Sequence, residues 1–169
     1  AANNSNISLA CVADIAAGTY PALFNILLAL HQRTITGRGC YLDVAMTDNL
    51  FTFMYWAIGN HAVTGQIPAN GGELVTGGSP RYNLYPTRDG RMVAAAPIEQ
   101  KFWENFCTLI DIEPEFRDNA AAPDATKRRI GELILHHDAS YWEQKFSSSD
   151  CCCVVVRTIE EALNDPHFK

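Results

Sequence analysis

The chain has 169 residues, of which 47% are hydrophobic and 19% charged, and its net charge at pH 7 is −6. This length suits one compact domain or parts of two, and the composition excludes a disordered chain. The run Lys127-Arg128-Arg129 is typical of a solvated helix face. A nucleic-acid-binding surface needs a larger basic patch, so no nucleic-acid partner is expected.

The N-terminal segment and the longest apolar stretch both argue against export or membrane insertion. Residues 1–8 are polar and lack the basic start and apolar core of a signal peptide. The apolar stretch 15–30 is interrupted by Gly18 and Pro21 and falls short of the ~20 clean apolar residues of a membrane span. A buried core helix is therefore predicted, and no membrane partner is expected.

Six cysteines indicate a reducing compartment and not a disulfide framework. Cys11, Cys40 and Cys107 are isolated, whereas Cys151-Cys152-Cys153 runs directly into three valines. This run predicts a buried strand that uses cysteine as a small hydrophobic residue. Neighbouring strand residues point to opposite faces, so the three thiols cannot converge on one metal. No C-x-x-C pair occurs, and a cytoplasmic location is expected.

The first third of the chain predicts a helix, a strand and a second helix. Pro21 fits the first turn of a helix that begins near Thr19 or Tyr20 and is apolar nearly all round. Residues 36–39 end this helix, and 40–46 are predicted as a strand. Thr47 is the expected N-cap of a helix over 48–63, and the glycine- and proline-rich residues 64–80 predict a linker or a long functional loop.

The remainder of the chain predicts a small α+β unit. Strands at 82–86 and 91–96 flank Arg88-Asp89-Gly90, whose Asp-Gly pair is a strong hairpin signal. The elements expected after the hairpin are helices at 100–110, 126–136 and 140–147, a strand at 152–156 and a short helix at 158–163.

Asp14 is the first candidate for chemistry. It is predicted to lie in the turn just before the apolar helix, where an aspartate is commonly a cap. The alternative is a catalytic carboxylate, because a helix N-terminus favours negative charge and an ionised carboxylate acts as a nucleophile or a base. The small residues 16–18 would let a substrate approach it closely.

Several segments in order resemble the family III CoA-transferases, which include the α-methylacyl-CoA racemases. The resembling segments are 13–18, 26–30, 36–39, 44–48, 74–91, 98–103 and 160–167. The resemblance implies an α/β fold, with part of a Rossmann-like large domain at 1–66 followed by a small α+β domain at 80–169. Residues 67–79 are the glycine-rich linker between them, and the chain looks like the middle of a family member about twice as long.

The resemblance makes Asp14 the catalytic aspartate of an acyl-CoA enzyme. Such an enzyme either moves CoA between carboxylic acids through an aspartyl thioester or racemises a 2-methylacyl-CoA by exchanging its α-proton. The implied substrate is a coenzyme A thioester, with no permanently bound cofactor and no metal. Family members form interlocked dimers, so a homodimer or higher oligomer is expected.

Four further residues are candidates for the site. Glu99 matches a glutamate linked to the racemase active site, or is a surface residue that opens the next helix. Gly77 and Gly78 are the nearest equivalent of a glycine-rich loop that covers the aspartate in one branch of the family, or mark a tight bend. Tyr82 lines the acyl pocket or is an ordinary strand aromatic.

The resemblance also shows what has no counterpart in this chain. The first part of the large domain, with most of the CoA-nucleotide pocket, is absent, and none of the five histidines precedes Asp14. The racemases use a histidine upstream of their aspartate. The alternative reading is therefore a truncated, non-catalytic module that binds acyl-CoA or a partner protein.

Overall fold

The computed structural model describes residues 11–118 and 121–168, so the polar segment 1–8 lies outside the described residues. The chain divides after Ile67 into two compact units, which are described separately. The first unit is helical, and the second combines a three-stranded sheet with helices.

The first unit begins with one long helical segment. A π-helical stretch, η1 (Val12–Thr19), runs directly into α1 (Tyr20–Thr36), which carries Pro21 in its first turn as predicted. Gly37 ends the helix in the left-handed conformation, with a φ of 72°. The prediction for Asp14 was wrong in one respect. The aspartate lies inside the helical segment, in the first turn of η1, and not in a turn that precedes it.

Two other predictions for this unit were also wrong. The predicted helix at 48–63 is two helices, α2 (Met46–Thr52) and α3 (Tyr55–Thr64), and Thr47 lies inside α2 and not at its cap. The strand predicted at 40–46 does not form: residues 40–45 have no regular secondary structure, and Met46 is already the first residue of α2. A strand needs a hydrogen-bonding neighbour, and every described strand of this chain belongs to the sheet of the second unit.

The predicted burial of α1 is also not observed. No residue of α1 is buried, and large apolar side chains such as Phe24 and Leu28 are exposed, the latter by 66%. Together η1 and α1 form a helix of 25 residues that is long and apolar enough to cross a membrane. The core helix of a soluble protein passes the same test of length and composition. The interrupting Gly18 and Pro21 thus shorten the apolar run in the sequence without breaking the helix.

The second unit is built on an antiparallel sheet of β1 (Asn83–Pro86), β2 (Met92–Ala95) and β3 (Cys153–Val155) in the order β1-β2-β3. The predicted hairpin is confirmed, with Leu84 opposite Ala94 and a Gly90 φ of 78° in the turn. Burial alternates along the strands, so one face points to the core and the other to solvent.

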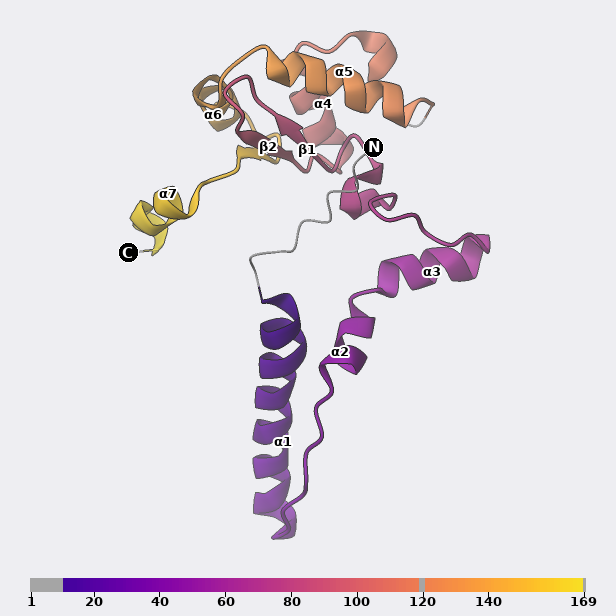
Figure 1. Cartoon of the computed structure of the whole chain (residues 1–169), viewed down its shortest axis with the longest axis vertical. Helices are drawn as coiled ribbons and strands as arrows, with labels where there is room; N and C mark the ends of the chain where they lie inside the picture. The colour runs from indigo at the N-terminus through magenta and orange to yellow at the C-terminus, as the bar shows by residue number, and fades with distance from the viewer. Residues whose placement is uncertain (1–10, 119–120, 169) are drawn as a thin grey trace. The chain divides into compact units, whose positions relative to one another are not determined.

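Three helices cover the inner face of the sheet. These are α4 (Gln100–Leu109), α5 (Pro123–Leu135) and α6 (Ala139–Ser147), close to the predicted bounds (Figure 1). Phe106 and Trp142 belong to the core, and the Trp142 indole donates a hydrogen bond to the Ile134 carbonyl at 2.9 Å. Short 3₁₀ turns, η3 (Pro114–Phe116) and η4 (Pro166–Phe168), complete the unit.

The loop before the hairpin contains a second π-helical turn, η2 (Leu74–Gly78). Its backbone comes so close to the preceding loop that a Cβ atom on Gly78 would lie 2.1 Å from the carbonyl oxygen of Gly72. Gly77 has a φ of 108°, a conformation that residues with a side chain rarely adopt. Both glycines are therefore required by the local backbone.

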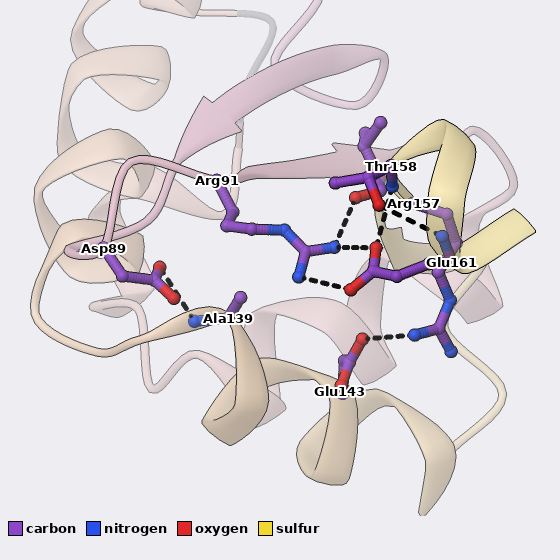
Figure 2. Close-up of polar contacts among 8 residues, drawn as sticks. Asp89, Arg91, Ala139, Glu143, Arg157, Thr158 and Glu161 are labelled. Carbon is purple, nitrogen blue, oxygen red and sulfur yellow. Dashed lines mark hydrogen bonds and ion pairs between the residues drawn. The ribbon is translucent and has the colours of Figure 1, made fainter.

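An ion pair ties the short helix α7 (Ile159–Asn164) to the start of β2. Figure 2 shows the Arg91 guanidinium directed at Glu161, with hydrogen bonds of 2.9 and 2.8 Å to its two carboxylate oxygens. Glu161 also accepts a hydrogen bond of 2.7 Å from the backbone N–H of Thr158, which completes a capping box. In the same view Arg157 pairs with Glu143 at 3.0 Å.

The Gly78→Ala substitution is expected to lower the free energy of unfolding by about 1–3 kcal/mol, because the added methyl group forces two backbone segments apart. Urea unfolding followed by tryptophan fluorescence measures this change. Gly131→Ala in α5 is the matched control: its Cβ would meet only Tyr85 at an ordinary 3.9 Å, so a gain of up to about 1 kcal/mol is expected. Equal stabilities of Gly78→Ala and wild type would contradict this interpretation.

The Glu161→Gln substitution is expected to loosen α7, because it removes the negative charge that forms the ion pair with Arg91. Amide hydrogen exchange over 159–164 should become faster, while Glu160→Gln in the same turn should leave it unchanged. The Thr158 N–H and then Arg91 hold the pKa of Glu161 below its ordinary value of 4.5. A lowered pKa stabilises the folded form above pH 4.5, and this contribution is lost as the pH falls through the folded-state pKa. Wild-type α7 should therefore loosen in acid, and the variant should show no such step.

Candidate active site

Asp14 is held in the first turn of η1 with its side chain exposed. Its backbone carbonyl accepts a hydrogen bond of 2.9 Å from the Thr19 hydroxyl, which supports the helical turn. Among the described residues, the structure shows no hydrogen bond or ion pair to its carboxylate. The oxygens of Asp14 are therefore open to a ligand, as a nucleophile or a base requires.

The small residues after Asp14 have a packing role. Ala17 is buried, and its carbonyl accepts a hydrogen bond of 2.8 Å from the Asn49 side chain in α2. A Cβ on Gly18 would come within 3.2 Å of the Met46 side chain. The space expected for a substrate is thus filled at Ala17 and Gly18 by α2, which leaves the approach to Asp14 itself open.

Gly77 and Tyr82 come together in the second unit, where they line one depression of about 420 Å³. The depression lies between η2 and the outer face of the hairpin, and this volume falls in the range of small-molecule sites. Gly78 does not line it and instead packs on Gly72. The other lining residues are Val75, Thr76, Asn83, Leu84, Ala94, Ala95 and Ala96.

The lining of this depression is apolar and carries no charged side chain. Its polar groups are largely engaged in local hydrogen bonds. The Asn83 amide donates to the Gly77 carbonyl at 3.1 Å, and its oxygen accepts from the Leu84 N–H at 2.8 Å. The Thr76 hydroxyl accepts from the Glu73 N–H at 3.1 Å. The surface offered to a ligand therefore consists mainly of methyl and methylene groups, with the half-exposed ring of Tyr82.

Glu99 is the N-cap residue of α4, in agreement with the expectation of a surface glutamate at the start of this helix. Its carbonyl accepts a hydrogen bond of 3.0 Å from the Trp103 N–H, but its exposed carboxylate makes no capping hydrogen bond. Glu99 does not line the depression. The structure thus brings Gly77 and Tyr82 together, places Glu99 elsewhere on the second unit, and places Asp14 in the first unit.

Reasoning from sequence missed Leu84 and Ala94 as members of the depression. The hairpin register pairs these two residues, and both point to the outer face of the sheet. The Asp-Gly signal predicted the hairpin but not this register, because a two-residue Asp-Gly turn would pair Leu84 with Ala95. Within residues 11–118 and 121–168, no three His, Cys, Asp or Glu side chains are grouped as a metal site requires.

Comparison with known proteins shows relatives of two enzymatic types. The chain is 26% identical over 169 residues to an α-methylacyl-CoA racemase of Homo sapiens and 30% identical over 163 residues to that of Mus musculus. It is 25% identical over 166 residues to a succinyl-CoA–D-citramalate CoA-transferase of Chloroflexus aurantiacus. These alignments cover 98%, 92% and 93% of the chain but 44%, 42% and 40% of the relatives, so the chain spans less than half of their length.

Solved structures share the fold. A crystal structure of Rv3272 from M. tuberculosis matches 96% of this chain and 44% of its own, with a TM-score of 0.71 at 18% sequence identity. The match to the sequence pattern of CoA-transferase family III extends over residues 4–169. The ordered segments that resemble this family in the sequence are therefore part of one continuous match, and the chain belongs to CoA-transferase family III.

Proposed function

We propose that this chain is part of an acyl-CoA enzyme in which Asp14 is the catalytic carboxylate. The enzyme either moves CoA between carboxylic acids or racemises a 2-methylacyl-CoA. Membership of CoA-transferase family III supports the acyl-CoA substrate, and relatives named for each reaction support both reactions.

The observation that carries the assignment of Asp14 is its free carboxylate in the first turn of a helix. An aspartate that only caps or braces a helix is expected to use its side-chain oxygens on nearby N–H groups. Asp14 makes no such bond within the described part of the chain. The helix dipole stabilises a negative charge at this position, so the carboxylate is available for reaction.

Both reactions start from the same arrangement of carboxylate and thioester. In CoA transfer, an Asp14 oxygen attacks the thioester carbonyl carbon, the C–S bond breaks, and CoA leaves as the thiolate to form an aspartyl anhydride. The CoA thiolate then attacks the aspartyl carbonyl, releasing the first acid, and an acceptor carboxylate later takes over the CoA through the reverse steps. In racemisation, Asp14 exchanges a proton at the α-carbon, and a second acid works on the opposite face.

The depression at Gly77 and Tyr82 is proposed to hold part of the acyl group. Its apolar lining suits a hydrocarbon chain, because no cation in the lining would pair with a carboxylate. Glu99 is given only a supporting role in the proposed reaction, because it lies at the N-cap of α4 and does not line the depression.

A second copy of the chain is the proposed partner, in a cytoplasmic homodimer or higher oligomer. The support is the exposed apolar surface of α1, where side chains such as Phe24 and Leu28 have no cover within the described residues. Apolar surface of this extent is characteristic of an interface.

The Asp14→Asn substitution is expected to lower turnover by about 10²–10⁴-fold, because the amide is neither a nucleophile nor a base of useful strength. The 169-residue chain is incubated with a 2-methylacyl-CoA in deuterated water, and separately with an acyl-CoA and an acceptor acid. Mass spectrometry then measures α-deuterium incorporation in the first reaction and new CoA thioester in the second. Asp48→Asn, an exposed acidic residue in the first turn of α2, is the matched control and should retain full activity.

These assays also separate the two reactions and the non-catalytic alternative. Deuterium exchange without acceptor-dependent transfer indicates a racemase, and transfer without exchange indicates a transferase. Saturable binding of acyl-CoA with neither reaction would overturn the catalytic proposal for this chain and leave a binding module. Full activity in Asp14→Asn would remove Asp14 from the mechanism.

Ala94→Phe is expected to weaken binding of long-chain acyl-CoA by roughly 10-fold or more, because the ring fills the depression beside Leu84. Binding of CoA itself should change little. Met92→Phe is the control, since Met92 is exposed on the same strand and face but does not line the depression. Isothermal titration with a long-chain acyl-CoA and with free CoA measures both. An equal loss for the two ligands would show that the depression does not hold the acyl group.

A further inference from the structure

The three consecutive cysteines at the start of β3 do not share one environment. Cys151 and Cys153 are buried, with 1% and 6% of their surface exposed, whereas Cys152 between them is exposed. Cys152 has a φ of 50°, so the backbone bends there and leaves the extended conformation. The two buried side chains belong to residues two apart in the sequence, on either side of this bend.

A hydrogen bond links the two buried cysteines. The Cys153 thiol donates to the Cys151 carbonyl at 3.2 Å. The interaction between the two thiols holds the pKa of Cys151 below its ordinary value, and this interaction together with burial raises the pKa of Cys153. A left-handed central residue brings the flanking Cα atoms closer than an extended one does, and a disulfide requires about 4.4–6.8 Å between them.

A small oxidant has a route to Cys153, and it reaches the more deeply buried Cys151 when this edge segment opens locally. Cys153 lines an open depression of about 580 Å³ between α6 and β3, together with Phe146, Ser147 and Val155. β3 is a three-residue strand at the edge of the sheet, and such segments open locally at low cost in free energy. Hydrogen peroxide, which is little larger than water, fits this route.

We propose that Cys151 and Cys153 are a site of reversible thiol oxidation, which a hydroperoxide converts into a disulfide across Cys152. The Cys151 thiolate attacks one peroxide oxygen, the O–O bond breaks, and hydroxide leaves, giving a sulfenic acid on Cys151. The Cys153 sulfur then attacks the Cys151 sulfur, the S–O bond breaks, and water leaves with the Cys153 proton. The two thiols are oxidised by two electrons and the peroxide is reduced to water.

The neighbouring thiols are poorer candidates for the same reaction. Partial desolvation and the charges of Asp150 and Glu99 raise the pKa of Cys152, so less of it is thiolate. Burial raises the pKa of Cys107 to about 11, and this cysteine has no second cysteine next to it in the sequence. In a reducing compartment the proposed bridge would be transient, as expected of a redox-sensing disulfide and not of a structural one.

Peptide mass mapping of the oxidised protein tests this site. The 169-residue chain is treated with hydrogen peroxide, alkylated with iodoacetamide and digested with trypsin, which yields the segment 146–157 with all three cysteines. This peptide is expected to lose two hydrogen atoms and to carry a single alkyl group, which tandem mass spectrometry should place on Cys152. Treatment with dithiothreitol before alkylation should restore three alkyl groups.

Variants locate the bridge independently. Cys152→Ser should still lose two hydrogen atoms, whereas Cys151→Ala and Cys153→Ala should not, and Cys107→Ser should behave as wild type. Because a buried substitution can disturb folding, the position of the alkyl group in wild type is the deciding measurement. The proposal is overturned if that group lies on Cys151 or Cys153, or if all three cysteines are alkylated after peroxide has oxidised the exposed Cys11 and Cys40.

Discussion

The pairing of β2 with a neighbour on each side is the constraint on which the second unit depends. Because side chains alternate across a strand, this pairing directs Val93 and Val155 into the core and Leu84 and Ala94 to the outer face. The inner face is covered by α4, α5 and α6, which excludes water from the core. The outer face is left open, and its alanines and leucine form the floor of the depression proposed to bind the acyl group.

The same sheet also fixes the positions of α7 and of the segment that leads into β3. Arg91, next to the first residue of β2, holds α7 through Glu161, and the segment that leads into β3 carries the three cysteines. Cys151 and Cys153 are buried in the core of the second unit, whereas Cys152 between them is exposed. A small sheet therefore positions an apolar depression, a docked helix and a pair of interacting thiols.

The first unit is organised by a close contact between η1 and α2 and not by a large core. Ala17 is its one buried hydrophobic residue within the described range, and α2 reaches η1 through the Asn49 side chain. This close approach needs the small side chains at Ala17 and Gly18, as a larger residue at position 18 would meet Met46. Asp14 is presented beside that contact, on a helix whose apolar surface is still uncovered. Its proposed catalytic role rests on family membership together with its free carboxylate.

The sequence by itself determined the features that local physical chemistry decides. The Asp89-Gly90 turn, the helix end at Gly37 and the capping box of Thr158 and Glu161 depend on φ preferences and on hydrogen bonds across three or four residues. The ordered motifs of the family were also visible in the sequence, and they made Asp14 the candidate catalytic residue before any coordinates.

Only the tertiary structure decided the features that need partners distant in the sequence. Residues 40–46 have the pattern of a strand, but a strand forms only where another strand accepts its hydrogen bonds. Position 78 needs a glycine because the backbone of Gly72 approaches it closely. Gly77 and Tyr82 line one depression because the loop that contains Gly77 folds onto the hairpin. These contacts depend on how distant parts of the chain pack together in the folded protein, and no local sequence pattern specifies that packing.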